Sequence, residues 1–140
     1  MKKIAVVYWS GTGNTEAMAC AVAEGAREKG AAATVFTASE FLADQVSGYD
    51  AIAFGCPSMG SEQLEETEFE PMFMDCESVL RGKKVALFGS YGWGNGEWMR
   101  DWEERCAEDG VDLVGDSVIC CGSPDDGALS ACRALGAALA

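Results

Sequence analysis

Hydrophobic residues in this chain gather in short continuous runs, and the segments between these runs are more polar. The runs lack a strict alternation of apolar and polar positions, which is typical of strands that are covered on both faces of a parallel sheet. The last run is expected to be irregular, because Gly115 and Asp116 interrupt it. The predicted strands cover residues 4–9, 34–37, 51–55, 84–90 and 113–121.

Helical periodicity is found between the strands, where apolar residues recur three or four positions apart. It is clearest for Trp98, Met99, Trp102 and Cys106, which fall on one face of a predicted helix. The other predicted helices are one that follows the first loop and ends at Gly30, a weak one at about 39–46, one at about 68–80 and a last one after residue 124.

Strands that alternate with helices predict one α/β domain over residues 1–140, built on a doubly wound, five-stranded parallel sheet with helices on both faces. In such a sheet, ligands bind beyond the carboxyl ends of the strands, near the point where the strand order reverses. Glycine-containing loops follow the first, third and fourth predicted strands. These three loops can therefore converge on one crevice.

The first of these loops contains two glycines, three hydroxyl side chains and one amide side chain, and a helix follows it directly. Glycine lets the backbone turn tightly, and the helix presents unpaired N–H groups and the positive end of its dipole, so the loop predicts an anion site. No Lys or Arg occurs between Lys3 and Arg27, and Glu16 stands where a dinucleotide-binding loop needs its third glycine. The expected ligand is one phosphate held by uncharged donors, and the alternative is a polar turn that only caps the helix. The predicted phosphate-binding residues are Ser10, Gly11, Thr12, Gly13, Asn14 and Thr15.

The other two loops each carry a large side chain next to glycine. Met59 precedes Gly60, and Trp93 lies between Gly92 and Gly94. A tryptophan framed by glycines has little local reason to be buried, so Trp93 suits stacking on a flat aromatic ring, with the sulfur of Met59 against the opposite face. The alternative is that Trp93 is an ordinary core residue. A flat ring joined to one terminal phosphate describes FMN.

Charge and composition exclude several classes of partner and of chemistry. The chain has 10 basic and 23 acidic residues, a net charge of −13, which repels nucleic acid and anionic membranes and suits a basic protein partner. There is no histidine, so histidine-based catalysis and the commonest zinc ligand are excluded, and no metal site is expected. The N-terminal apolar run is too short for a signal peptide or a membrane span, and the seven cysteines form no C-x-x-C pair. A cytoplasmic protein with reduced thiols is therefore expected.

The sequence resembles the short-chain flavodoxins of anaerobic bacteria over essentially its full length. The resemblance is carried by three motifs, which are residues 8–16 (YWSGTGNTE), 59–62 (MGSE) and 89–94 (GSYGWG). It implies a flavodoxin-like sheet with strand order 2-1-3-4-5. It also implies that FMN lies where the strand order reverses, and flavodoxin is itself a known example of that rule.

The resemblance implies individual roles as well. Met59 and Trp93 would flank the isoalloxazine ring, the peptide after Gly60 would turn over on reduction, and Glu62 would lie near flavin N3. Pro57 stands where close relatives can carry a phosphate-directed serine, and Ser58 is the candidate substitute. Beyond the phosphate loop, the implied cofactor-binding residues are Pro57, Ser58, Met59, Gly60, Glu62, Ser90, Tyr91, Gly92, Trp93 and Gly94.

A flavodoxin is an electron-transfer protein and not an enzyme, so no catalytic residue is expected. The resemblance implies that FMN cycles between semiquinone and hydroquinone at low potential, and that the protein substitutes for ferredoxin. Seven acidic residues and no basic residue lie between Glu62 and Glu77, and their charge would oppose that of the reduced flavin. The expected partners are ferredoxin-dependent redox proteins that dock with a monomer at this acidic flavin edge. The alternatives are an FMN-dependent NAD(P)H or quinone reductase and an FMN storage protein.

Overall fold

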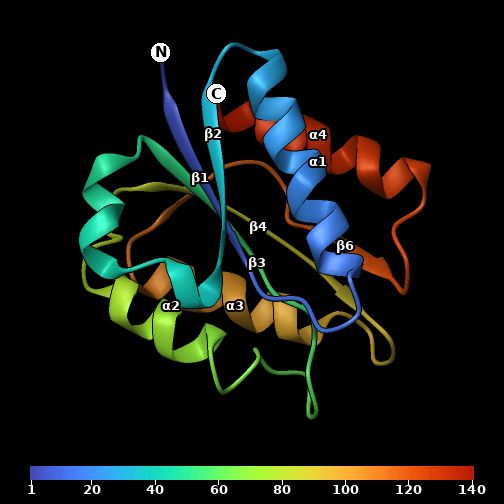
Figure 1. Cartoon of the computed structure of the whole chain (residues 1–140). Coiled ribbons are helices and arrows are strands. Elements are labelled where there is room, and N and C mark those ends of the chain that lie inside the picture. The colour runs from blue at the N-terminus through green and yellow to red at the C-terminus, as the bar shows by residue number, and fades with distance from the viewer.

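Six strands form one sheet, and every neighbouring pair in it runs parallel (Figure 1). The structure is a computed structural model that describes residues 1–140. The strand order is β2-β1-β3-β4-β5, with β6 also pairing with β4, so the predicted order is confirmed. The strands are β1 (Lys3–Tyr8), β2 (Ala32–Thr37), β3 (Ala51–Gly55), β4 (Lys84–Tyr91), β5 (Asp112–Leu113) and β6 (Val118–Cys121).

The last predicted strand is divided into two pieces, as its interruption suggested. β5 pairs with Lys84 and Val85 at the start of β4, whereas β6 pairs with residues 88–91 at its end. Gly115 has a φ of 69°, a left-handed conformation that breaks the extended backbone between the two pieces. The outer edge of β4 is therefore covered in two segments.

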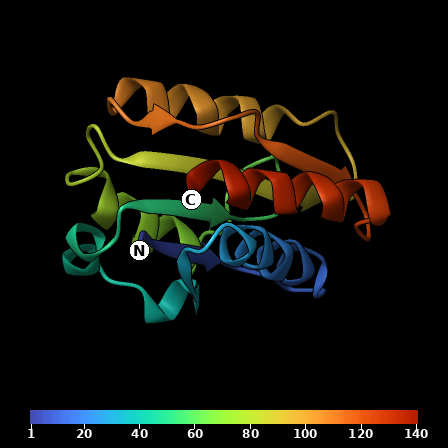
Figure 2. The same cartoon turned by 90° about the horizontal axis from the view of Figure 1, so that it is seen from above.

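Four α-helices cover the sheet, with α1 and α4 on one face and α2 and α3 on the other (Figure 2). Pro71 lies in the first turn of α2, where a missing N–H is tolerated. α2 is shorter than the helix predicted at 68–80, because the N–H groups of Val79 and Leu80 bond to carbonyls three residues earlier and tighten the chain into a turn. None of the helices is both long and apolar enough to span a membrane. Their bounds are α1 (Asn14–Glu28), α2 (Phe69–Glu77), α3 (Glu97–Glu108) and α4 (Asp126–Leu139).

The weak α-helix predicted at about 39–46 is wrong, because the chain forms two 3₁₀ turns there, η1 (Ala38–Glu40) and η2 (Ala43–Gly48). Between them Phe41 is extended, with φ −107° and ψ 128°, and its side chain is 2% exposed. Burying this ring in the core keeps the backbone out of a continuous helix.

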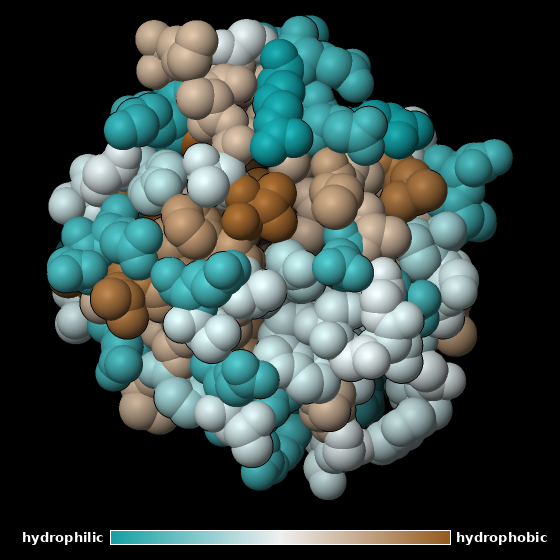
Figure 3. All heavy atoms as spheres, in the orientation of Figure 1, coloured by the Kyte–Doolittle hydropathy of each residue, from teal (hydrophilic) through white to brown (hydrophobic).

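The two faces of the sheet are packed differently. α2 and α3 bury large aromatic side chains against β3 and β4, whereas α1 packs on α4 through small residues. A Cβ atom at Gly25 would lie 1.8 Å from a carbonyl oxygen of α4, and one at Gly136 would lie 1.9 Å from a carbonyl oxygen of α1. These glycines let the two helices touch along their backbones, which fixes α1 on the sheet. Because most large apolar side chains lie inside, only small separate groups of hydrophobic residues reach the surface in Figure 3.

Candidate functional site

A cleft of about 250 Å³ opens at the carboxyl ends of β1, β3, β4 and β6. Hydrogen bonds between main-chain groups connect its walls, since the Trp9 N–H donates to the Gly55 carbonyl and the Ser58 N–H donates to the Ser90 carbonyl, both at 3.0 Å. The cleft is lined by Trp9, Gly11, Thr12, Asn14, Pro57, Ser58, Met59, Ser90, Tyr91, Gly92 and Gly122. The three loops singled out in the sequence thus meet in one place.

The loop after β1 presents its donors in two directions. Thr12 and Asn14 line the cleft, whereas Ser10 and Gly13 line a hollow of about 420 Å³ next to it. Thr15 is 1% exposed and lies behind the loop, in neither space. The predicted phosphate-binding residues are therefore near one another in the chain, but they do not all face the same space.

Backbone geometry at the start of α1 leaves N–H groups available to a ligand. Gly13 is the residue that precedes the helix, and it has a φ of 93°, which a residue with a side chain rarely adopts. Its own N–H donates to Ser10 Oγ at 3.0 Å, and no side chain caps the helix beyond it. No basic residue lines the cleft. The donor set fits a phosphate that is bound by uncharged groups at a helix N-terminus.

The loop after β3 ends in a tight turn. Met59 and Gln63 exchange two main-chain hydrogen bonds, of 2.8 and 3.0 Å, which close the turn between them. Within it Gly60 has a φ of 46°, and nothing lies within 4 Å of the position that a Cβ atom would take. Glu62 has a φ of 53°, the one non-glycine residue of the chain with a positive φ. Strain of this kind is held in place by surrounding contacts.

Glu62 supplies such a contact, because its carboxylate reaches the beginning of α3. Glu62 Oε1 accepts from the Glu97 N–H at 3.0 Å, and a Cβ atom at Gly94 would lie 2.7 Å from the same carboxylate. The side chain joins the second loop to the third and does not line the cleft. Its contact with flavin N3 stays a prediction.

The loop after β4 carries the exposed tryptophan. Trp93 is 62% exposed, whereas Trp98 and Trp102, which lie at periodic positions in α3, are each 2% exposed. The interpretation of Trp93 as an ordinary core residue is therefore wrong. Ser90 is 4% exposed, and its hydroxyl donates to the Gly122 carbonyl at 2.7 Å, so it ties β4 to the end of β6.

Two residues of the cleft were missed by the reasoning from sequence. The sequence predicts Trp9 only as the end of the first strand, but it lines the cleft, and its Nε1 donates to Glu68 Oε1 at 3.1 Å. Gly122, which is not among the site residues predicted from the sequence, also lines the cleft. Its position directly after a predicted strand indicates a place in the cleft, because the carboxyl ends of all strands of a parallel sheet lie on one edge.

One residue of the acidic run from Glu62 to Glu77, Glu65, forms hydrogen bonds within the protein. Glu65 is 5% exposed, and its carboxylate accepts from three main-chain N–H groups at 2.8–2.9 Å where α2 begins, and from the hydroxyl of Thr67. Burial by itself raises the pKa of Glu65, but these hydrogen bonds outweigh it and lower the pKa below its ordinary value. Glu65 is thus a cap for α2, and its charge is already compensated.

A basic residue from another element pairs with two more of these acids and compensates one of their two charges. Arg105, on α3, donates to both carboxylate oxygens of Glu70 and of Glu77 at 2.6–2.8 Å. Its guanidinium also lies 4.9 Å from the centre of the Phe73 ring. The members of the run that neither cap α2 nor pair with Arg105 are Glu62, Glu66, Glu68 and Asp75.

Comparisons with known proteins agree with this architecture. A family profile for flavodoxin matches residues 6–136. The chain is 46% identical to the flavodoxin of Megasphaera elsdenii, over 83% of this chain and 85% of that protein, and 47% identical to that of Clostridium beijerinckii, over 86% and 88%. The solution structure of two-electron reduced Megasphaera elsdenii flavodoxin matches with a TM-score of 0.90, at 44% identity and with 97% of each chain covered. Nothing in these comparisons favours a reductase. The chain therefore belongs to the flavodoxin family, and it is an FMN-binding electron carrier and not an enzyme.

Proposed function

We propose that the protein carries single electrons at low potential between cytoplasmic redox proteins, in place of a ferredoxin, with FMN held in the three-loop cleft. One observation carries the proposal. The N-terminus of α1, which no side chain caps and which carries no basic residue, and the exposed Trp93 lie at the same edge of the sheet, on loops that meet in one cleft. When bound, FMN supplies the ring that accepts and releases the electrons.

The phosphate of FMN would be held by the loop of residues 10–15. Thr12 and Asn14 face the cleft and can donate directly, and the free N–H groups at the start of α1 add the field of the helix. Ser10 would act through Gly13, because its hydroxyl keeps that backbone in place. Thr15, which is buried, would contribute its main-chain N–H.

The ring would lie between Met59 and Trp93, with Pro57, Ser58 and Tyr91 along the wall of the cleft. Met59 sits on a turn whose bonds hold it toward the cleft. The peptide after Gly60 is unobstructed and can rotate, so that the Gly60 carbonyl would accept a hydrogen bond from the ring once the ring carries the extra proton.

The remaining acids would lower the potential of the second electron. Glu62, Glu66, Glu68 and Asp75 keep charges that are not paired with Arg105. Each tenfold preference for the less reduced state moves a one-electron couple by about 59 mV. Repulsion worth a few kcal/mol thus shifts the couple by on the order of 100–200 mV.

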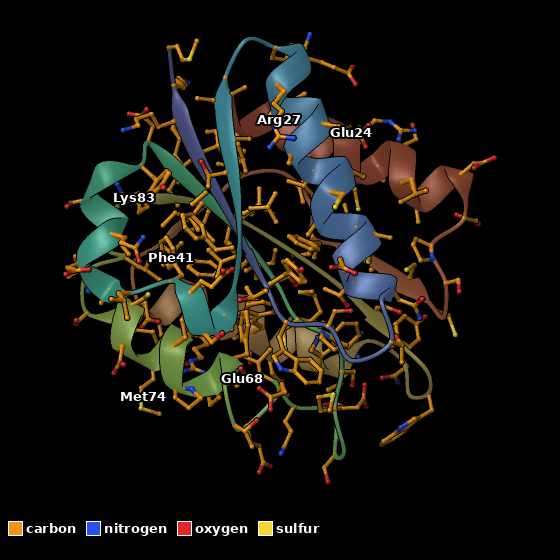
Figure 4. All side chains as sticks on the ribbon, viewed as in Figure 1. Glu24, Arg27, Phe41, Glu68, Met74 and Lys83 are labelled. Atoms are coloured by element: carbon orange, nitrogen blue, oxygen red, sulfur yellow. The ribbon has the colours of Figure 1, made fainter.

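Most basic residues of this molecule lie near the amino ends of the strands, which leaves few positive charges at the flavin edge and suits docking of a basic partner there. Seven of the ten basic residues lie at or near the amino ends of β1 and β4 or the end of α1, away from the cleft. In Figure 4, Arg27 and Lys83 lie on that side, whereas Glu68 lies on the opposite side. A monomer would therefore present the acidic residues of the run at 62–77 and the exposed Trp93 to a basic partner, with weak binding that salt disrupts. The seven basic residues are Lys2, Lys3, Arg27, Lys29, Arg81, Lys83 and Lys84.

The test is a visible spectrum of the purified protein, followed by anaerobic reduction. A yellow protein is expected, and stepwise reduction should produce a long-wavelength absorbance band that neither the oxidised nor the fully reduced protein shows. NADPH alone should not bleach it, since rapid bleaching would indicate a reductase. A folded protein that stays colourless with excess FMN, or one that is reduced without the long-wavelength band, would refute the proposal.

Two variants distinguish contacts with the ring of the cofactor from contacts with its phosphate. Trp93→Ala should weaken the binding of FMN and of riboflavin about equally, by about tenfold, because both ligands share the ring. Thr12→Ala should weaken FMN binding alone, because riboflavin has no phosphate. Equal losses for both ligands with Thr12→Ala would contradict the phosphate assignment.

A further inference from the structure

Tyr8 and Glu16 form a pair beside the phosphate loop that the site described above does not use. The Tyr8 hydroxyl donates to Glu16 Oε2 at 2.9 Å. Glu16 is the third residue of α1, so it stands in the first turn, next to the N–H groups that a phosphate would take. Both side chains line the hollow on the side of the loop away from the cleft, together with Ser10 and Gly13.

A glutamate or glutamine at this position of a helix ordinarily reaches back and accepts from the N–H of the residue before the helix. This protein does so twice, because Glu40 accepts from the Thr37 N–H at 2.8 Å and Gln45 closes η2 in the same way at 2.7 Å. At α1 the corresponding glutamate is turned away. The N–H of Gly13 is taken by Ser10 instead.

We propose that the Tyr8 hydroxyl holds the Glu16 carboxylate out of the anion site, so that the N-terminus of α1 stays open to the phosphate of the cofactor. This inference rests on the phosphate site of the proposed function. A carboxylate folded back onto the helix would compete with the phosphate in two ways. It would occupy the donors of the first turn, and its charge would repel the phosphate dianion.

Tyr8 is well placed for this role. Its side chain is 8% exposed and belongs to β1, so the position of its hydroxyl is set by the sheet and not by the loop. Burial and the hydrogen bond to Glu16 raise the pKa of Tyr8 to about 12, so the hydroxyl keeps its proton and donates throughout the physiological range. Replacing it by phenylalanine removes only the donor.

The test is a titration of the apoprotein with FMN and with riboflavin, which share the ring but differ in the phosphate. Tyr8→Phe is expected to weaken FMN binding about five- to tenfold, the usual effect of one capping group, and to leave riboflavin binding unchanged. Adding Glu16→Ala to Tyr8→Phe should restore FMN binding, because both the competing charge and the side-chain oxygen that could occupy the first-turn donors are gone. Tyr49→Phe is the matched control, since it removes a tyrosine hydroxyl far along the chain, and it should change neither affinity.

A second variant leaves the buried tyrosine intact. Glu16→Asp shortens the side chain by one methylene, so it can no longer reach the Tyr8 hydroxyl but can still turn back onto the helix. It should also weaken FMN binding without affecting riboflavin. This keeps the inference testable if Tyr8→Phe fails to fold.

The outcomes are distinguishable. If the wild-type protein binds FMN and riboflavin equally well, the phosphate site of the proposed function is wrong, and this inference falls with it. If the wild type prefers FMN but Tyr8→Phe and Glu16→Asp keep that preference, the inference alone is overturned. Equal weakening of both ligands would show that Tyr8 has only a structural role, which also overturns it.

Discussion

Replacing Arg105 by methionine should destabilise the protein, because it leaves two glutamates of α2 without their partner. The methionine side chain keeps an apolar stem next to the Phe73 ring, so packing is largely preserved. Glu70 and Glu77 would then carry like charges on one helix with no base between them. The substitution therefore tests the charge of Arg105 more than its volume.

The expected loss in the free energy of unfolding follows from the exposed fractions of the three side chains. Arg105, Glu70 and Glu77 are 28%, 29% and 19% exposed, so the cluster is neither a surface pair nor a fully buried one. Exposed pairs contribute about 0–1 kcal/mol, and removing one partner of a buried pair costs about 3–5 kcal/mol. We expect a loss of about 2 kcal/mol in the free energy of unfolding, which is a fall in Tm of roughly 6 °C.

The assay is urea unfolding at pH 7, followed by tryptophan fluorescence and circular dichroism, at one fixed FMN concentration. A triple variant that combines Arg105→Met with Glu70→Gln and Glu77→Gln should recover most of the loss, because the unpaired charges are removed. Salt at about 1 M should reduce the defect of the single variant, since the screening length is then about 3 Å. A single variant within about 0.5 kcal/mol of the wild type would refute the reasoning.

Three further predictions concern packing, pH and the thiols. Gly136→Ala should lower the free energy of unfolding by about 3 kcal/mol or more in the same urea assay, because its Cβ atom would lie 1.9 Å from a carbonyl oxygen of α1; a neutral result would mean that the helices separate freely. A hydrogen bond to Glu77 and burial raise the pKa of Asp109 from 3.8 to about 6, so the folded state binds the proton more tightly, and this carboxyl makes stability fall as pH rises from about 4 to 6. In Asp109→Asn this pH dependence of stability should be absent. The prediction would be contradicted if the free energies of unfolding of the variant and the wild type differed by the same amount at every pH between 4 and 8. A thiol reagent should modify the exposed cysteines in the native protein, whereas burial raises the pKa of the buried thiols and they should react only after unfolding; rapid native reaction of all thiols would contradict this. The exposed cysteines are Cys20 and Cys121, and the buried ones are Cys56, Cys76, Cys106 and Cys132.

The pattern of this sequence was sufficient for the strands, the three loops and the family, because each of these depends on residues that are close together in the chain. A continuous apolar run such as residues 51–55 indicates a strand buried on both faces, whatever surrounds it. The exposure of Trp93 was also foreseeable, since glycines flank it and no periodic pattern includes it. The false helix at 39–46 has the opposite cause, because long-range burial of Phe41 overrode the local preference.

The electrostatics of the site were decided only by the tertiary structure. The segment from Glu62 to Glu77 contains acidic residues and no basic one, but Arg105, from a helix about thirty residues farther along, pairs with two of them. In the same way, Glu16 reads as an ordinary first-turn glutamate until β1 brings the Tyr8 hydroxyl to it. Charges act through space and not along the chain, so their partners become known only when the fold sets the distances between them.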